Sequence, residues 1–558
     1  MSDAMTDLRQ QLMWTRMISI VEESAQALMR TAFSTTVRDA GDLSAAIFDT
    51  QGRMIAEAVT GTPGHVNSMA EGVRHFLARF PIDEMQDGDH FVTNDPWLTA
   101  GHLHDITVIS PVVVNGSVVA LVGCCCHQVD IGGLGQGPDG RSIFEEGLQI
   151  PLLKLASAGV LNRDLMDILR TNVRTPMQAE GDMLSYISCN QSGAVRLRAM
   201  LDEYGLQNFD TLADYIVDQS LTATREAIGK LPRGSWTADM TIDGYDAPIT
   251  LRAKLTIDAN SISLDYTGSA AAVSQGINVV LNYCRAYSIF GLKCVVAPQV
   301  PNNYGALAPF VVDAPVGSIL NAQRPSPVAA RHVIGQMLPD LVFGCLGQAL
   351  PDRTPAEGSS CLWSVQLRGA GPTGAEEESG ASVAFDTVFF NSGGSGARAA
   401  QDGLSATAFP SGVRAMPVEV TEAGAPIVIW RKELRADSGG AGRTQGGLGQ
   451  SVEVGTRDGA SFEVLAMFER VRSAARGRAG GKDGATGTVS LASGSTLRAK
   501  GLQRIPTDDR LVLELPGGAG LGNPSERPAA QIASDVAHGR LSQAFAHTFY
   551  PHSTSNDL

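Results

Sequence analysis

The sequence predicts an α+β fold, a large multi-lobed mixed structure whose C-terminal half is rich in glycine and in strands. Hydrophobic residues make up 43% of the 558 residues and charged residues 18%, so the chain can bury a large core. Glycine is abundant, with 61 residues, which favours frequent turns and close backbone approaches. Segments in which apolar residues recur with helical spacing follow segments in which apolar and polar residues alternate as in strands. No internal repeat is visible in the sequence.

The periodicity of apolar residues places most of the elements. Residues 5–36 show helical spacing, and two apolar runs at 43–48 and 54–59 flank a turn and predict a hairpin. Further helices are predicted at 64–80, 161–171, 175–204, 278–296, 329–349 and 528–547. Further strands are predicted at 91–94, 106–114, 118–126, 235–244 and 251–268, and residues 373–382 are predicted to form a polar loop.

No linker in the chain is long or polar enough to mark a clear domain boundary. We therefore expect one unit over residues 5–525, with a metal-bearing sub-lobe at about 1–230 and a mixed β/α sub-lobe at about 231–525. A C-terminal helix and tail are expected over 526–558.

Charge and cysteine content exclude several classes of protein. The net charge is −15 and no basic stretch dominates, so nucleic acid is not an expected partner. The N-terminus lacks the pattern of a signal peptide, and no apolar run is long enough to span a membrane. The eight cysteines show no CxxC spacing, and three of them are consecutive at 124–126. These features favour a cytoplasmic, reducing compartment, in which the thiols act as small buried hydrophobes.

The most informative local pattern is Asn115-Gly116, which separates the predicted strands 106–114 and 118–126. Asn-Gly between two apolar runs is typical of a tight β-hairpin turn, so the two strands should pair antiparallel. The start of the first strand and the end of the second then lie side by side. This arrangement brings together His102, Asp105 and His127.

Two imidazoles and one carboxylate at these positions form a candidate site for a divalent metal, namely Zn, Mn or Fe(II). Three protein ligands leave coordination positions open for water or for a small carbonyl substrate. In the alternative interpretation, His102 and His104 are loop residues bonded to the backbone and His127 is a satisfied core histidine. His104 could also replace or support His102.

Three nearby carboxylates are candidate catalytic or orienting groups. Asp130 follows His127 by three residues and could be a fourth ligand or could orient a ligand. Asp95 is held extended by Pro96 and could orient a metal-bound histidine, although it could equally form an Asx turn. Glu146 follows a glycine-rich loop and could be a general base, although it could instead be a solvated carboxylate at a helix start.

Two other kinds of site are not supported. The glycine-rich loops contain no GxxxxGK[ST] motif, and none clearly lies between a strand and a helix, so this chain is not expected to bind a nucleotide. A Ser-His-Asp triad is also unsupported, since no GxSxG turn is present.

Several segments together make the chain resemble the hydantoinase B family over about residues 8–550. The superfamily includes subunits of ATP-dependent hydantoinases, the C-terminal part of 5-oxoprolinase, and subunits of acetone and acetophenone carboxylases. The segments that carry the resemblance are GDLSAAIFD (41–49), GHVNSM (64–69), DGDHFVTNDP (87–96), GHLHDIT (101–107), HQVDIGG (127–133), EGLQIP (146–151), NVRTP (172–176), SGGSGAR (392–398), GGAGR (439–443) and PGGAGLG (516–522).

The resemblance implies that the family's metal ligands fall on His102, Asp105 and His127. It also implies a hydantoinase A-type partner subunit that binds ATP and Mg and phosphorylates the carbonyl oxygen of the substrate, in a hetero-oligomer such as a heterotetramer. One departure is Gln128, where members of the family often carry a second histidine after the position of His127.

The resemblance leaves three functions open. The first is ATP-dependent ring opening of a cyclic amide such as a hydantoin or a lactam, which the compact length weakly favours. The second is ATP-dependent carboxylation of a ketone, and the third is a non-catalytic scaffold for the partner subunit.

Overall fold

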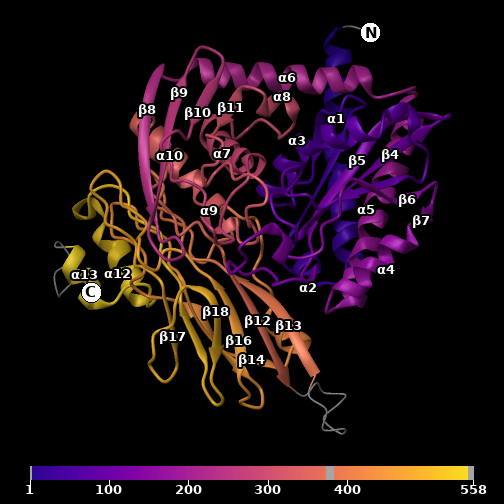
Figure 1. Ribbon diagram of the computed structural model, residues 1–558. Coiled ribbons are helices and arrows are strands. Elements are labelled where there is room, and N and C mark those ends of the chain that lie inside the picture. The colour runs from indigo at the N-terminus through magenta and orange to yellow at the C-terminus, as the bar shows by residue number, and fades with distance from the viewer. Residues whose placement is uncertain (1–2, 372–382, 551–558) are drawn as a thin grey trace.

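The N-terminal part of the chain is built on a seven-stranded antiparallel sheet in a computed structural model that describes residues 3–371 and 383–550 (Figure 1). The strand order is β2-β1-β5-β4-β3-β6-β7. The strands are β1 (Leu43–Phe48), β2 (Met54–Glu57), β3 (His90–Thr93), β4 (Asp105–Val114), β5 (Ser117–His127), β6 (Leu153–Ser157) and β7 (Val160–Leu161).

Helices cover both faces of this sheet. Helices α1 (Asp3–Thr31) and α5 (Pro176–Tyr204) pack on one face, and α3 (Pro63–Arg79) packs on the other. The short helices α2 (Thr35–Arg38) and α4 (Arg163–Asn172) flank α1 and α5. Because β5 is central and buried on both faces, its three consecutive cysteines divide between the two cores, Cys124 and Cys126 on one side and Cys125 on the other. The thiols are free and buried there, as the sequence predicted.

Helix α6 (Asp210–Gly229) leads from this lobe to the next and runs along one side of both (Figure 1). The sequence analysis missed this helix, because polar Ser220 and Thr224 interrupt its buried face and weaken the apolar period.

The second lobe contains a four-stranded sheet of order β11-β10-β9-β8. Its strands are β8 (Gly234–Ile242), β9 (Ile249–Ile257), β10 (Ile262–Asp265) and β11 (Phe310–Asp313), and the sheet packs against helices α7 (Leu281–Val296) and α10 (Leu338–Ala349). The lobe also contains the short helices α8 (Tyr304–Leu307) and α9 (His332–Gly335). Helix α7 also packs against α3, so it joins the first and second lobes.

The prediction of a single helix over residues 329–349 is wrong. The structure divides this segment into α9 and α10, separated by Gln336 and Met337. Pro339 stands in the first turn of α10, where its missing N–H costs nothing, whereas inside a continuous helix it would remove a hydrogen bond and clash with the preceding turn. The break leaves α9 as a single short turn, and His332 of this turn lines the candidate site together with the flanking Arg331 and Gln336.

The C-terminal half contains two four-stranded sheets that share one hydrophobic core (Figure 1). One has the order β13-β12-β16-β18 and the other β14-β15-β19-β17. The elements are β12 (Trp363–Gly371), β13 (Val383–Asn391), α11 (Val418–Gly424), β14 (Ile427–Leu434), β15 (Gln450–Thr456), β16 (Phe462–Met467), β17 (Thr488–Leu491), β18 (Lys500–Ile505) and β19 (Leu511–Glu514). The polar loop predicted at 373–382 lies outside the described residues.

Glycine-rich segments around residues 393–396, 439–449 and 516–522 pack directly against one another beside these sheets. Their backbones exchange hydrogen bonds, including Gly447 N–H to Ser395 O (2.9 Å) and Gly518 N–H to Gly447 O (2.9 Å). A Cβ atom at Gly394 would overlap the carbonyl oxygen of Gly447, so the packing requires the absence of side chains.

The C-terminal helix predicted at 528–547 is two helices, α12 (Ala529–Ala537) and α13 (Gln543–Phe549). Gly539 has a φ of +68° and ends the first of them. The predicted α+β class is confirmed. The expected division into units at 5–525 and 526–558, with sub-lobes at about 1–230 and 231–525, stays a prediction. Across the described ranges 3–371 and 383–550, no helix is long and apolar enough to cross a membrane.

Candidate metal centre

The hairpin predicted from Asn115-Gly116 is confirmed. Strands β4 and β5 pair antiparallel, and both turn residues have positive φ values, 50° and 80°, as a tight hairpin turn requires. The register pairs Asp105 with His127 at the open end of the hairpin. Local structure therefore brings these two residues together.

Asp105 is the centre of the candidate site, because three histidines and one arginine contact its carboxylate. Its Oδ1 lies 2.8 Å from Nε2 of His102 and 3.0 Å from Nδ1 of His127. Its Oδ2 lies 2.9 Å from Nε2 of His65, which stands in the first turn of α3, and also accepts a hydrogen bond from Arg331 Nη2. The Asp105 side chain is fully buried.

The imidazoles of His102, His104 and His127 form a compact group, with ring centroids 5.3 to 5.5 Å apart. Backbone carbonyls hold two of them, since His102 Nδ1 lies 2.9 Å from Ala329 O and His104 Nδ1 lies 2.8 Å from Gln128 O. These contacts fix the ring orientations, as hydrogen-bond partners of metal-binding histidines commonly do.

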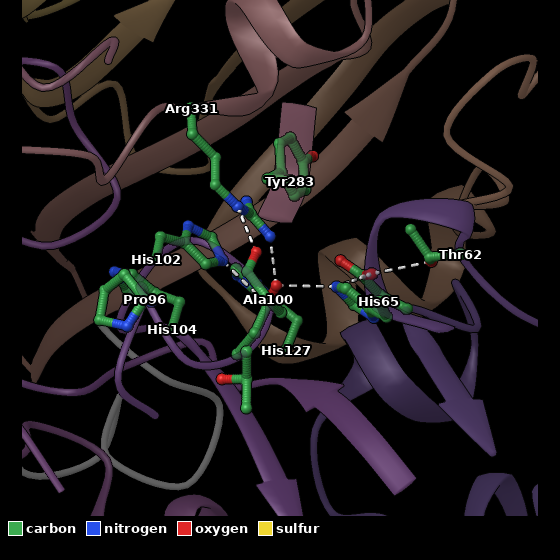
Figure 2. A network of polar contacts seen from close by, with 12 residues as sticks. Thr62, His65, Pro96, Ala100, His102, His104, His127, Tyr283 and Arg331 are labelled. Atoms are coloured by element: carbon green, nitrogen blue, oxygen red, sulfur yellow. Dashed lines mark hydrogen bonds and ion pairs between the residues drawn. The ribbon is translucent and has the colours of Figure 1, made fainter. Parts of the chain in front are cut away.

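The second lobe closes the site from the other side. Arg331 is 3% exposed, donates from Nε to Ala100 O (2.6 Å), and places its guanidinium 3.9 Å from the ring centroid of Tyr283. His332 follows it in α9. Figure 2 shows Arg331 and Tyr283 on the side of the site opposite to His127.

These residues surround a small cavity of about 30 Å³, which is room for about one water molecule or ion. Its wall includes residues from all three parts of the chain: Asp42, Thr62, His65, His102, Asp105, His127, Gln136, Tyr283, Tyr287, Arg331, His332, Gln336, Leu362, Ser364, Phe390 and Val413.

Burial favours the neutral form of two imidazoles in the cavity, His102 and His332, whereas the carboxylate of Asp105 is held in its charged form. Burial and then the Arg331 charge hold the pKa of His102 well below its ordinary value, and the same two causes lower the pKa of His332 to about 3. Burial opposes the charge of Asp105, but His102, His65 and Arg331 outweigh it and hold its pKa well below the usual range. Neutral imidazole and ionised carboxylate are the forms that bind a metal ion.

The residues present fit the divalent metal that the sequence predicts. Ligand atoms of His102, Asp105 and His127 all lie within 4.8 Å of one another. Within the described part of the chain, His127 Nε2 and both ring nitrogens of His332 are buried without a hydrogen-bond partner, which is costly unless a ligand uses them. A second group of His65, Asp105 and Cys125 meets the same distance limit, but burial raises the pKa of the Cys125 thiol far above its ordinary value and disfavours the thiolate that a metal requires.

The three predicted catalytic carboxylates do not line this cavity. Asp130 accepts hydrogen bonds from Gly132 N (2.9 Å) and from Arg174 Nη1 (2.8 Å). Asp95 accepts from Trp97 N (3.0 Å), which is an Asx turn, and its other oxygen lies 2.5 Å from Arg324 Nη2. Both carboxylates organise loops next to the site.

Glu146 is also engaged with backbone, but in a way that reaches the site. Its Oε1 accepts from Val328 N (2.7 Å) and Ala329 N (2.9 Å), and Ala329 O in turn contacts His102. Glu146 therefore holds the segment that orients a candidate ligand. Burial raises the pKa of Glu146 to about 8.

This shift predicts a pH-dependent contribution to stability. Because the pKa of Glu146 is higher in the folded protein than its ordinary value of 4.5, folding favours the protonated form. Its contribution is complete below pH 4.5 and is lost as the pH rises to about 8. Glu146→Gln keeps the hydrogen bonds without the charge, so its free energy of unfolding should exceed that of the wild type increasingly from about pH 5 to about pH 8, by about 1.4 kcal/mol for each unit of the shift.

Urea unfolding at several pH values measures this difference. Glu203→Gln, at an exposed position of α5, is the matched control and should follow the wild type. Parallel pH profiles for Glu146→Gln and the wild type would contradict the prediction.

Sequence reasoning missed four residues of the site, namely His65, Tyr283, Arg331 and His332. His65 stands in a segment that carries the family resemblance, GHVNSM, so that resemblance could have pointed to it. The other three belong to the second lobe and show no pattern in the sequence that links them to the hairpin.

The chain belongs to the hydantoinase B/oxoprolinase family, whose model matches residues 7–524. Among the relatives, a protein named as a subunit of a putative D-/L-hydantoinase, from a Pseudomonas strain, is 28% identical over 97% of this chain and 95% of its own length. The beta subunit of caprolactamase from Pseudomonas jessenii is 28% identical over 93% of this chain and 91% of its own length.

Solved structures show the same fold. The crystal structure of an ATP-dependent caprolactamase from Pseudomonas jessenii matches with a TM-score of 0.89 and 25% identity, over 99% of this chain and 97% of that chain. A nucleotide-free acetone carboxylase structure matches with a TM-score of 0.84 and 19% identity, over 98% of this chain and 79% of that chain.

Proposed function

We propose that this chain is the metal-bearing subunit of an ATP-dependent cyclic-amide hydrolase that opens a lactam or hydantoin ring. The observation that carries the proposal is the buried cavity in which Asp105 Oδ1 lies 2.8 Å from His102 Nε2 and 3.0 Å from His127 Nδ1, while His127 Nε2 has no hydrogen-bond partner among the described residues. Relatives named as hydantoinase and caprolactamase subunits, each aligned over more than nine-tenths of its own length, support the reaction class.

In this proposal His102, Asp105 and His127 hold a divalent ion, which is Zn, Mn or Fe. When bound, such an ion supplies Lewis acidity that polarises a carbonyl group or lowers the pKa of water. His65 and Arg331 hold Asp105 from the side away from His102 and His127 and fix its orientation. His332 has two unpartnered ring nitrogens, within the described residues, and as a neutral imidazole can donate one hydrogen bond and accept another in the cavity.

Three carboxylates that lie outside the cavity, those of Asp95, Asp130 and Glu146, are positioning groups in this proposal. Glu146 holds the backbone that orients His102, Asp130 holds the loop after His127, and Asp95 holds the loop before His102 through Arg324. Each acts on a ligand-bearing segment through backbone and ion-pair contacts.

The ATP-using half of the active site belongs to a partner of the hydantoinase A type in this proposal. The chain itself carries no phosphate-binding GxxxxGK[ST] motif. Two of its relatives are named as subunits, one of a hydantoinase and the other of a caprolactamase, which supports a hetero-oligomer. The partner would bind ATP and Mg and phosphorylate the carbonyl oxygen of the substrate.

Assay of the chain co-expressed with its ATP-binding partner tests the function. ATP consumption and product formation are measured with hydantoin, ε-caprolactam and acetone, each with and without bicarbonate. The expected result is ATP-dependent formation of a ring-opened product, independent of bicarbonate. Turnover of acetone that requires bicarbonate would contradict hydrolysis and would assign the chain to ketone carboxylation, the alternative that the acetone carboxylase fold leaves open.

A further inference from the structure

A second, larger pocket lies next to the metal centre on the other side of the first turn of α3. Its volume is about 300 Å³, which suits a small organic molecule. Thr62 lines both this pocket and the cavity around Asp105, so the two are neighbours. The walls are mainly apolar and include Ala58, Pro63, Val66 and Phe290.

Two hydrogen-bond acceptors stand side by side in this pocket. Asn302 donates from Nδ2 to Glu57 Oε2 (2.7 Å) and to Asn67 Oδ1 (2.9 Å), which fixes the orientation of its amide. The amide oxygen of Asn302 is buried and, as far as the chain is described, accepts no hydrogen bond. The Glu57 carboxyl beside it is buried deeply enough to raise its pKa to about 7.

The pocket also contains one cationic side chain that does not satisfy these acceptors. Lys293 Nζ donates to the carbonyl oxygen of Val300, and burial lowers the pKa of Lys293. The charge of Lys293 only partly offsets the effect of burial on Glu57. A ligand that brings a donor cation to Glu57 and Asn302, and an anion to Lys293, would satisfy all three groups.

We propose that this pocket binds a small zwitterionic amino acid. Its ammonium group donates to Glu57 and Asn302, its carboxylate pairs with Lys293, and its short carbon chain lies against Val66 and Phe290. Both charges are needed, because a lone cation would be repelled by Lys293 and a lone anion by Glu57.

The ligand class stands on the pocket alone, whereas its place in a reaction rests on the proposed function. Hydrolysis of a lactam breaks the ring C–N bond, adds the elements of water and yields an amino acid with both of these charged groups. Ring opening of a hydantoin leaves a carbamoyl group in place of the ammonium group. The pocket therefore points to lactams as the substrate class and to itself as the site that holds the product beside the metal centre.

Isothermal titration of the complex with its partner subunit, without ATP, tests the proposal with 5-aminopentanoate as the probe. Pentanoate, pentylamine and 2-piperidone are titrated for comparison. The expected result is binding of 5-aminopentanoate at least about tenfold tighter than any of the three. Tighter binding of 2-piperidone, or equal binding of pentanoate or pentylamine, would overturn the proposal.

Variants locate the binding in the pocket. Glu57→Gln should weaken 5-aminopentanoate binding at least about tenfold, and Lys293→Met should abolish the preference over pentylamine. Glu84→Gln, at an exposed glutamate, is the matched control and should bind as the wild type does. Thermal melts verify that each variant is folded. Unchanged binding in Glu57→Gln would overturn the assignment, and since no step uses ATP, the outcome does not depend on whether lactam hydrolysis occurs.

Discussion

Replacement of Asp105 by asparagine is expected to remove most of the bound metal and to lower turnover by the co-expressed complex at least about 10²–10³-fold. Asparagine has nearly the same shape as aspartate, but it lacks the negative charge. Four side chains contact that charge in the wild type, namely His65, His102, His127 and Arg331. Elemental analysis of the purified protein and the ATP-dependent assay measure the two effects.

Two histidine variants complete this test. His127→Ala should lose metal as Asp105→Asn does, whereas His75→Ala, at an exposed position of α3, should retain it. Equal metal content in His127→Ala and the wild type would refute the assigned ligands. Full activity of Asp105→Asn in the complex would leave the chain with the role of a scaffold.

Arg331→Met is expected to cost about 3–5 kcal/mol in the free energy of unfolding of the metal-free protein. The substitution keeps an unbranched side chain but removes the cation–π contact with Tyr283 and leaves the buried carboxylate of Asp105 without its guanidinium partner. A bound divalent cation would replace part of the lost positive charge, so the loss should be smaller in the metal-loaded protein. Denaturant unfolding with and without added metal measures both values.

Arg252→Met is the matched control. Arg252 is about half exposed and pairs with an equally exposed Asp239, so its loss should leave the free energy of unfolding nearly unchanged in either form. An equal cost for Arg331→Met with and without metal would contradict the placement of the cation at Asp105.

The part of the site that could be predicted from the sequence is the part that local structure creates. Asn115-Gly116 determines a tight turn, the turn determines the register of β4 and β5, and the register brings Asp105 next to His127. Every step spans fewer than about 25 residues and depends on backbone preferences that a single sequence displays.

The rest of the site depends on contacts between lobes. Arg331 reaches Asp105 across 226 positions of the chain, and Tyr283 reaches Arg331 from α7. Such contacts follow from how the lobes pack, and neither residue stands in a pattern that distinguishes it from other buried residues. The division of the helix predicted at 329–349 has a local cause instead, because Pro339 favours the first turn of a helix and disfavours a helix interior.

The glycine-rich segments around 393–396, 439–449 and 516–522 have a consequence for how mutational tolerance maps onto this molecule. Their backbones lie so close that even an alanine at Gly394, Gly446 or Gly518 would overlap a neighbouring carbonyl oxygen. No glycine lines the cavity around Asp105 as far as the chain is described. The three glycine positions are therefore intolerant of substitution for steric reasons alone. In a survey of all substitutions these glycine positions should be sensitive to change, and their sensitivity would come from the lack of space for a side chain and not from a catalytic or binding role.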